Sequence, residues 1–208
     1  QARMLAAQKS WAGQPEVSDL LTEIEAFGAG ASLDRCVGLA ATIGSAELAA
    51  QFACNLSKEL LAALAEEPIG QVPFRHNVSD QGASLMLADT GRAQLLLTER
   101  APMKQRAETA VFNMIERHDC ILAGQAQASI AEQRDDGSAP KLAAQQLRRG
   151  VTFSSSPGQH RRALLIEHVE QSLLTLRLVR HPAQDTAAPS VEVSLADGRI
   201  VHRAAATI

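Results

Sequence analysis

Aromatic side chains are scarce in this 208-residue sequence, which has no tyrosine, one tryptophan and five phenylalanines. Proteins that bind single-stranded nucleic acid stack its bases on exposed aromatic rings, and many sugar-binding sites use such rings as well. The sequence offers almost none. Its net charge of -3 also provides no overall basic field to attract nucleic acid. We therefore expect no nucleic-acid partner.

Cysteine is also rare, and its pattern argues against two kinds of site. Cys36, Cys54 and Cys120 are scattered and form no Cys-x-x-Cys pair, so neither a disulfide framework nor a cysteine-based zinc site is predicted. Cys120 follows His118 by two residues, which places both on one face of a strand and Asp119 on the other. Such a pair can serve as nucleophile and base, but we interpret Cys120 as a small buried hydrophobic residue. Reduced thiols of this kind are typical of the cytoplasm.

Long hydrophobic runs and the common catalytic signatures are absent. The longest apolar runs, such as LLAALA and ALLI, are far too short to span a bilayer. The sequence does not open with a basic segment followed by an apolar stretch, so no secretory signal is predicted. We therefore expect a cytoplasmic protein without a membrane partner. The sequence has no Gly-x-Ser-x-Gly, His-Glu-x-x-His, Walker or Gly-x-Gly-x-x-Gly motif. Serine hydrolases, zincins and nucleotide-binding folds are therefore not indicated.

The balance of charge changes along the chain and indicates two parts. Residues 1–70 carry 4 Lys and Arg against 9 Asp and Glu, whereas residues 71–208 carry 16 against 14. The pattern of apolar residues changes at the same place, from helical spacing to alternation. We predict a helical subdomain over 1–69 and a β-domain over 70–208.

The first part has the pattern of about three helices. EVSDLLTEIEAF repeats apolar residues at helical spacing, and we expect that helix to end at Gly28. A second helix is predicted within SLDRCVGLAATIG. The longest one is predicted to begin after Ser45, whose side chain can cap it, and to end before Pro68.

The second part has the pattern of short antiparallel strands. Turn signals at residues 89–91 and 197–198 predict two hairpins. We expect Gly124 to end one strand and begin another. Residues 170–171 are expected to form the turn of a further hairpin between HRRALLIEHV and SLLTLRLVRH. Roughly eight to ten strands at regular spacing predict a mostly β fold, an antiparallel jelly-roll or β-sandwich with an N-terminal helical extension.

Two glycine-containing stretches of the β-domain resemble motifs of the cupin family. GVTFSSSPGQH, from Gly150 to His160, resembles the second cupin motif, in which a glycine leads to a Pro-Gly turn and then a metal-ligating histidine. ERHDCILAGQAQASI resembles the end of the first motif, with Gly124 as its turn glycine. The resemblance covers residues 70–181 and implies a cupin-like roll. The first motif lacks its His-x-His pair, and Arg117 stands at the position of its glutamate, so the implied metal site is degenerate.

Histidines offer one alternative for a site. A cupin metal site needs three imidazoles and a carboxylate that point into the roll. This chain offers His160, with His118 and His76 from neighbouring strands as further ligands. His168 lies by the expected turn, and we interpret it as solvated. We expect no cofactor, and a divalent metal at these histidines is the alternative.

Arginines cluster on the strands around the same motif. Arg162 shares a strand face with His160, whereas Arg177 lies opposite the leucine-rich face of its own strand. If such a face lines the interior of the roll, its arginine needs a carboxylate partner or an anionic ligand. At a rim it would belong to a salt-bridged surface instead. We take His160, Arg162, His118 and Arg177 as the candidate ligand-binding residues.

These patterns favour a non-catalytic function. We expect a small-molecule-binding or regulatory module that holds a small anionic or apolar ligand in the roll. The first alternative is a metal-dependent cupin enzyme of the dioxygenase or isomerase type, with His160 as a ligand. The second is a protein-interaction module that acts as a homodimer through its helices or through an apolar sheet face such as the leucine-rich strand 173–178. We expect the chain to form a homo-oligomer, most simply a dimer.

Overall fold

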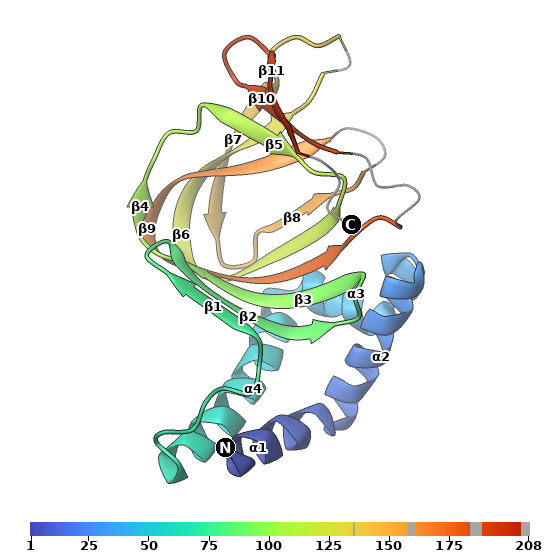
Figure 1. Ribbon diagram of the computed structural model, residues 1–208, viewed down its shortest axis with the longest axis vertical. Helices are drawn as coiled ribbons and strands as arrows, with labels where there is room; N and C mark the ends of the chain where they lie inside the picture. The colour runs from blue at the N-terminus through green and yellow to red at the C-terminus, as the bar shows by residue number, and fades with distance from the viewer. Residues whose placement is uncertain (135, 158–160, 184–188, 205–208) are drawn as a thin grey trace.

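The β-domain folds into a roll that rests on a layer of helices (Figure 1). The structure, a computed structural model, describes residues 1–134, 136–157, 161–183 and 189–204. Its mostly β architecture with an N-terminal helical region confirms the predicted fold class.

Short turns join the helices of the first part of the chain. Their bounds are α1 Ala2–Ala12, α2 Pro15–Ala29, the 3-10 turn η1 Leu33–Arg35, α3 Val37–Gly44 and α4 Ala46–Glu66. As predicted, the Ser45 hydroxyl caps α4 by accepting a hydrogen bond from the Leu48 amide at 3.4 Å. α1 has no counterpart among the predicted helices, and the predicted end at Gly28 is wrong, because Gly30 forms the cap of α2. Within the described ranges no single helix is long and apolar enough to cross a membrane, and α3 and α4 meet that test only together, across a bend of 98°.

The described strands form two antiparallel sheets. Their bounds are β1 His76–Ser79, β2 Gly82–Asp89, β3 Ala93–Arg100, β4 Met103–Lys104, β5 Thr109–Phe112, β6 Glu116–Glu132, β7 Lys141–Arg148, β8 Thr152–Ser155, β9 Arg162–Arg180, β10 Ser190–Ser194 and β11 Ile200–Ala204. The larger sheet has the order β1-β2-β3-β9-β6-β7, with β4 also paired to β9 and β8 to β6, and the smaller sheet has the order β11-β10-β5. The adjacent strands β3, β9 and β6 therefore join segments that are distant in sequence.

Two of the predicted hairpins are confirmed and one is wrong. β2 and β3 pair around the turn at 89–91, and β10 and β11 pair around the turn at 197–198. β9 instead continues without interruption through residues 170–171, so the hairpin predicted there does not exist. His168 consequently lies in mid-strand, opposite Gln127 of β6.

Gly124 bends β6 and does not end it, which corrects the predicted strand break. The register between β6 and β9 shifts on both sides of this glycine, as it does at β-bulges. Gly124 has a φ of +91°, and a Cβ atom there would lie 2.2 Å from the carbonyl oxygen of Ser172 on β9. Only glycine allows the two long strands to approach so closely where they curve around the roll.

Replacing Gly124 with alanine should lower the free energy of unfolding by roughly 2–3 kcal/mol, because the methyl group strains the left-handed backbone and collides with the Ser172 carbonyl. Gly91→Ala is the matched control, since Gly91 also has a positive φ, of +82°, but no other chain segment within 4 Å of an added Cβ. Urea unfolding of the two variants separates the collision from the backbone strain. If both variants lost the same free energy of unfolding, the contact with the Ser172 carbonyl would add no cost beyond the backbone strain.

The helices cover the outer face of the larger sheet. Leu176 and Leu178 of β9 belong to the same buried cluster as Trp11 of α1 and Phe27 of α2. Alternate residues of a strand face opposite sides of its sheet. Arg177 therefore faces away from the helices and into the roll.

Candidate functional site

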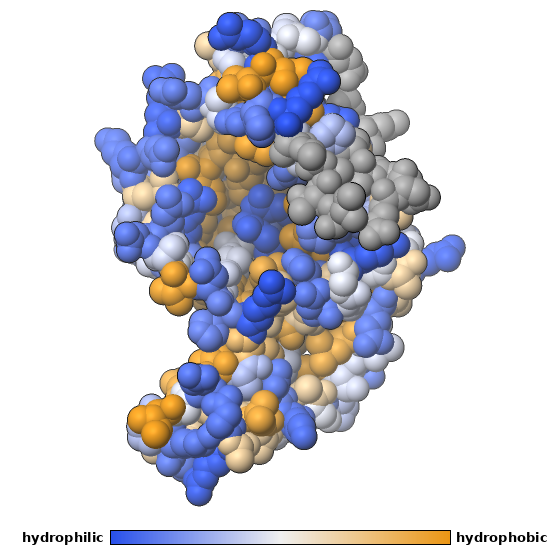
Figure 2. Space-filling model, viewed as in Figure 1, coloured by the Kyte–Doolittle hydropathy of each residue, from blue (hydrophilic) through white to orange (hydrophobic). Residues whose placement is uncertain are grey.

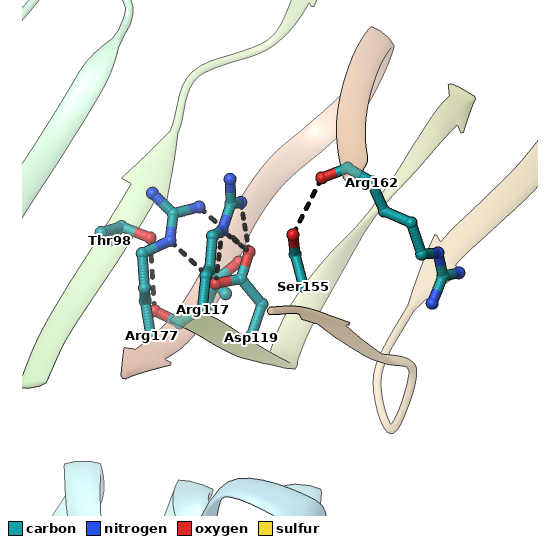
Figure 3. Close-up of polar contacts among 7 residues, drawn as sticks. Thr98, Arg117, Asp119, Ser155, Arg162 and Arg177 are labelled. Atoms are coloured by element: carbon teal, nitrogen blue, oxygen red, sulfur yellow. Dashed lines mark hydrogen bonds and ion pairs between the residues drawn. The ribbon is translucent and has the colours of Figure 1, made fainter. Parts of the chain in front are cut away.

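Neighbouring strands of the larger sheet bring the candidate site together inside the roll. In the sheet register Arg177 of β9 lies between Leu96 of β3 and Asp119 of β6, and Asp119 pairs with Phe153 of β8 on its other side. The side chains of Arg117, Asp119 and Arg177 lie on the side of the sheet away from the helices (Figure 3). The site therefore depends on long-range strand pairing and not on a local motif.

A buried carboxylate holds two of the arginines. The side chain of Asp119 is 1% exposed, and it accepts hydrogen bonds from Arg177 Nε at 2.8 Å and from Arg177 Nη2 at 3.1 Å. Arg117 Nε donates to both carboxylate oxygens, at 3.0 and 3.1 Å (Figure 3). Burial acts to raise the pKa of Asp119, but the charges of Arg177 and Arg117 outweigh it and hold that pKa below the usual range. The aspartate is therefore ionised and bridges both guanidinium groups.

A third arginine approaches this cluster without a carboxylate of its own. Arg100 lies two residues beyond Thr98 on the inner face of β3. Burial, and then repulsion from Arg177 and Arg117, lower the pKa of Arg100. Its Nε donates to Met103 Sδ at 3.2 Å, and within the described part of the chain no carboxylate oxygen lies within 4.0 Å of its guanidinium group. This end of the roll thus carries three neighbouring guanidinium groups, two of which are bound to the carboxylate of Asp119.

Arg100 and Arg177 line a pocket of about 220 Å³ inside the roll, together with Thr98, Thr175 and Ile166. The Nη1 atom of Arg177 and both Nη atoms of Arg100 have no hydrogen-bond partner among the residues that the structure describes. These donors are available to a ligand, because the ion pair with Asp119 uses only the Nε and Nη2 edge of the Arg177 guanidinium group.

Arg162 lines a neighbouring pocket, of about 240 Å³, that it shares with Arg117 and Phe153. The guanidinium groups of Arg162 and Arg117 lie 5.6 and 5.5 Å from the centroid of the Phe153 ring, within the range of cation–π attraction. Arg162 and Arg177, both candidates from the sequence, are therefore linked through Phe153, Arg117 and Asp119. They line different pockets.

His118 faces the helices and not the interior of the roll. Its Nδ1 contacts Ser154 Oγ at 2.9 Å and its Nε2 contacts Glu116 Oε1 at 3.0 Å, while its ring lies 6.4 Å from that of Phe27. The hydrogen bond from His118, and then that from Arg180, lower the pKa of Glu116 although burial opposes them. Arg180 also donates to the carbonyl oxygen of Phe27 at 3.0 Å. His118 thus belongs to the contacts that join the helices to the roll.

The histidines considered as metal ligands do not converge among the described residues. His160 lies outside those residues. His76 is exposed on the edge strand β1, where its Nδ1 contacts the carbonyl oxygen of Phe74 at 2.9 Å. β1 and the strand of His118, β6, are four steps apart in the sheet order, or about 19 Å along the curved sheet at ~4.8 Å per step. In the part of the chain that is described, no group of three or more His, Cys, Asp or Glu is placed to hold a metal ion, so His76 and His118 form no metal centre with other described residues.

The chemistry of the arginine cluster is that of anion binding. Guanidinium groups stay protonated near neutral pH and present planar sets of donors to carboxylate or phosphate oxygens. Asp119 is a weak base, because two cations stabilise its ionised form. The cluster is therefore suited to holding charge and poorly suited to transferring protons.

The sequence patterns do not identify three members of the cluster, Arg100, Arg117 and Asp119, as candidate site residues. Strand alternation places Asp119 on the face opposite Cys120 but does not pair it with Arg177. Strand alternation also places Arg100 on one face with Thr98 but does not show that this face lies inside the roll. The missing information is the register of β3, β9 and β6, which brings these residues together.

Comparison with known proteins finds only remote structural similarity. No protein-family model and no curated protein matches the sequence. Solved structures that are similar include the capsular polysaccharide assembling protein CapF from Staphylococcus aureus, with 13% identity and a TM-score of 0.40 over 65% of this chain and 36% of that chain. A sugar phosphate isomerase of the cupin superfamily from Silicibacter pomeroyi shows 10% identity and a TM-score of 0.38 over 59% of this chain and 77% of that chain. Drosophila melanogaster CENP-C bound to CAL1 shows 12% identity and a TM-score of 0.40 over 58% of this chain and 93% of that chain.

The resemblance of the sequence motifs to the cupin family therefore stays a prediction, with one structure of that superfamily among the similar ones. The chain spans only about a third of the length of CapF, with 36% of that protein covered. Likeness at 10–13% identity concerns the fold, and the function has to be argued from the site itself.

Proposed function

We propose that this protein is a non-catalytic module that binds a small anion inside its roll, with Arg100 and Arg177 as the binding residues. The observation that carries the proposal is the excess of positive charge, since Asp119 pairs with Arg117 and Arg177, whereas Arg100 is repelled by both and has no carboxylate partner among the described residues. A partly buried charge without a partner is costly, and an anion beside Arg100 removes that cost. The free Nη donors of both arginines supply charge-assisted hydrogen bonds to its oxygens.

Replacing Arg100 with glutamine should weaken the binding of acetate and of inorganic phosphate at least tenfold, because a hydrogen bond to a charged group contributes about 1.5–3 kcal/mol. NMR titration at low ionic strength measures affinities down to the millimolar range and limits screening by salt. The arginine side-chain resonances of Arg100 and Arg177 should shift with each anion.

Arg35→Gln is the matched control, because Arg35 is an exposed arginine of η1 outside both pockets. It should leave anion affinity unchanged. Equal affinities in wild type and Arg100→Gln would overturn the assignment of the site. An absence of binding by acetate, phosphate and longer carboxylates would overturn the proposed function.

A further inference from the structure

The pocket at Arg100 and Arg177 adjoins a larger one whose wall includes apolar side chains of β9. The larger pocket measures about 820 Å³ and shares Arg100 and Ile166 with the smaller one. Leu164 and Met103 also line it, and both side chains are only partly buried. On this face the roll is hollowed, and hydrophobic surface lines the hollow between hydrophilic edges (Figure 2). The cationic group at Arg100 therefore lies beside apolar surface that the protein itself leaves uncovered.

The outer part of the larger pocket carries the opposite charge. Glu108 and Glu192 line it together with Arg106. Thr109 Oγ1 donates to Glu192 Oε1 at 2.6 Å and so fixes that carboxylate at the wall between β5 and β10. Two carboxylates against one guanidinium group repel a second negative charge on a ligand whose first charge lies at Arg100.

We infer that the ligand is an organic acid with one anionic head and an apolar body. The head lies at Arg100 and Arg177, and the body extends along Leu164 and Ile166 of β9. The inference rests on the proposed anion site and adds the chemical class of the ligand. Each methylene group removed from water on binding raises affinity about fourfold, so the apolar wall discriminates against small inorganic anions. The acidic outer end discriminates against diacids.

Four probes on the wild-type protein test the inference, namely acetate, octanoate, suberate and 1-octanol. Octanoate should bind at least tenfold more tightly than acetate, because both have one carboxylate and only octanoate has a body to bury. Suberate, which has the same chain length and a second carboxylate, should bind at least tenfold more weakly than octanoate. 1-Octanol lacks the charge and should also bind more weakly. Isothermal titration at low ionic strength gives the four dissociation constants.

Leu164→Ser should remove most of the advantage of octanoate and leave acetate binding unchanged, since Leu164 lines the larger pocket and not the smaller one. Leu142→Ser is the control, because Leu142 is a leucine of β7 that is 48% exposed and outside both pockets. Arg100→Gln should weaken both acids. The four probes are measured on the wild-type protein, so that test does not depend on whether a variant folds.

The outcomes separate the inference from the proposed function. Equal affinity for acetate and octanoate, or for octanoate and suberate, would overturn the inferred ligand with one anionic head and an apolar body. The proposed anion site would be unaffected. If 1-octanol bound as tightly as octanoate, the pocket would be shown to select the apolar body whether or not the ligand has a charged head. A protein that binds none of the acids would overturn the proposed function as well.

Discussion

Replacing Asp119 with alanine is expected to lower the free energy of unfolding by about 3 kcal/mol, the low end of the range for removing one partner of a buried ion pair. The loss arises because Arg117 and Arg177 remain in the roll without their carboxylate. Their side chains are 22% and 28% exposed, so solvent screens part of the cost. Urea unfolding followed by the fluorescence of Trp11, the only tryptophan, measures the loss. Asp19→Ala, at an exposed position of α2, should stay within about 0.5 kcal/mol of wild type.

The pH dependence of the same variant gives a second measurement. Burial acts to raise the pKa of Asp119, but Arg177 and Arg117 outweigh it, so the pKa is lowered in the folded chain. A carboxyl group of this kind stabilises fully above its unfolded pKa of about 3.9 and loses that contribution as the pH falls through its folded pKa. Wild type should therefore lose more stability than Asp119→Ala on acidification below about pH 4. Parallel curves, or a loss at neutral pH under 1 kcal/mol, would contradict the ion-pair account.

The outline of the fold could be predicted where the chemistry is local. The turns at 89–91 and 197–198 contain glycine and aspartate in hairpin positions, and the Ser45 cap depends on neighbours within one helical turn. The long strands are different. Gly124 and the polar residues 170–171 have the composition of turns, yet they lie where β6 and β9 curve around the roll and pair with each other. A bulge and a turn use the same residue types, and only the partner strand distinguishes them.

The site shows the same division between local and long-range information. Strand alternation correctly places Arg177 opposite the leucines of β9, and an inward arginine implies a carboxylate or an anion. The identity of that carboxylate follows from the pairing of β9 with β6, which sets Asp119 beside Arg177 across 58 residues of sequence. The approach of Arg100 follows likewise from the pairing of β9 with β3. Such pairing is a property of the whole sheet, and a pattern within one segment does not contain it.

Replacing Arg100 with glutamine is expected to raise the stability of the ligand-free protein by about 1 kcal/mol, even though the same change weakens anion binding. Burial, and then repulsion from Arg177 and Arg117, lower the pKa of Arg100. A lowered pKa means that the folded chain disfavours the charged form relative to the unfolded chain. For a cation this cost is present at every pH below the folded pKa, which includes neutral pH. Glutamine keeps a polar side chain and removes the charge.

Arg100→Lys separates charge from shape, because it keeps the positive charge and loses the planar fork. It should retain the low stability of the wild type without ligand and bind anions less tightly than arginine does. Thermal unfolding with and without octanoate tests the trade-off directly. Saturating octanoate should raise the melting temperature of the wild type above that of Arg100→Gln, since a ligand that binds only the folded state stabilises it by mass action. A ligand-free Arg100→Gln that melts below the wild type would mean that the contact of Arg100 with Met103 outweighs the repulsion. Excess positive charge would then not destabilise the ligand-free protein.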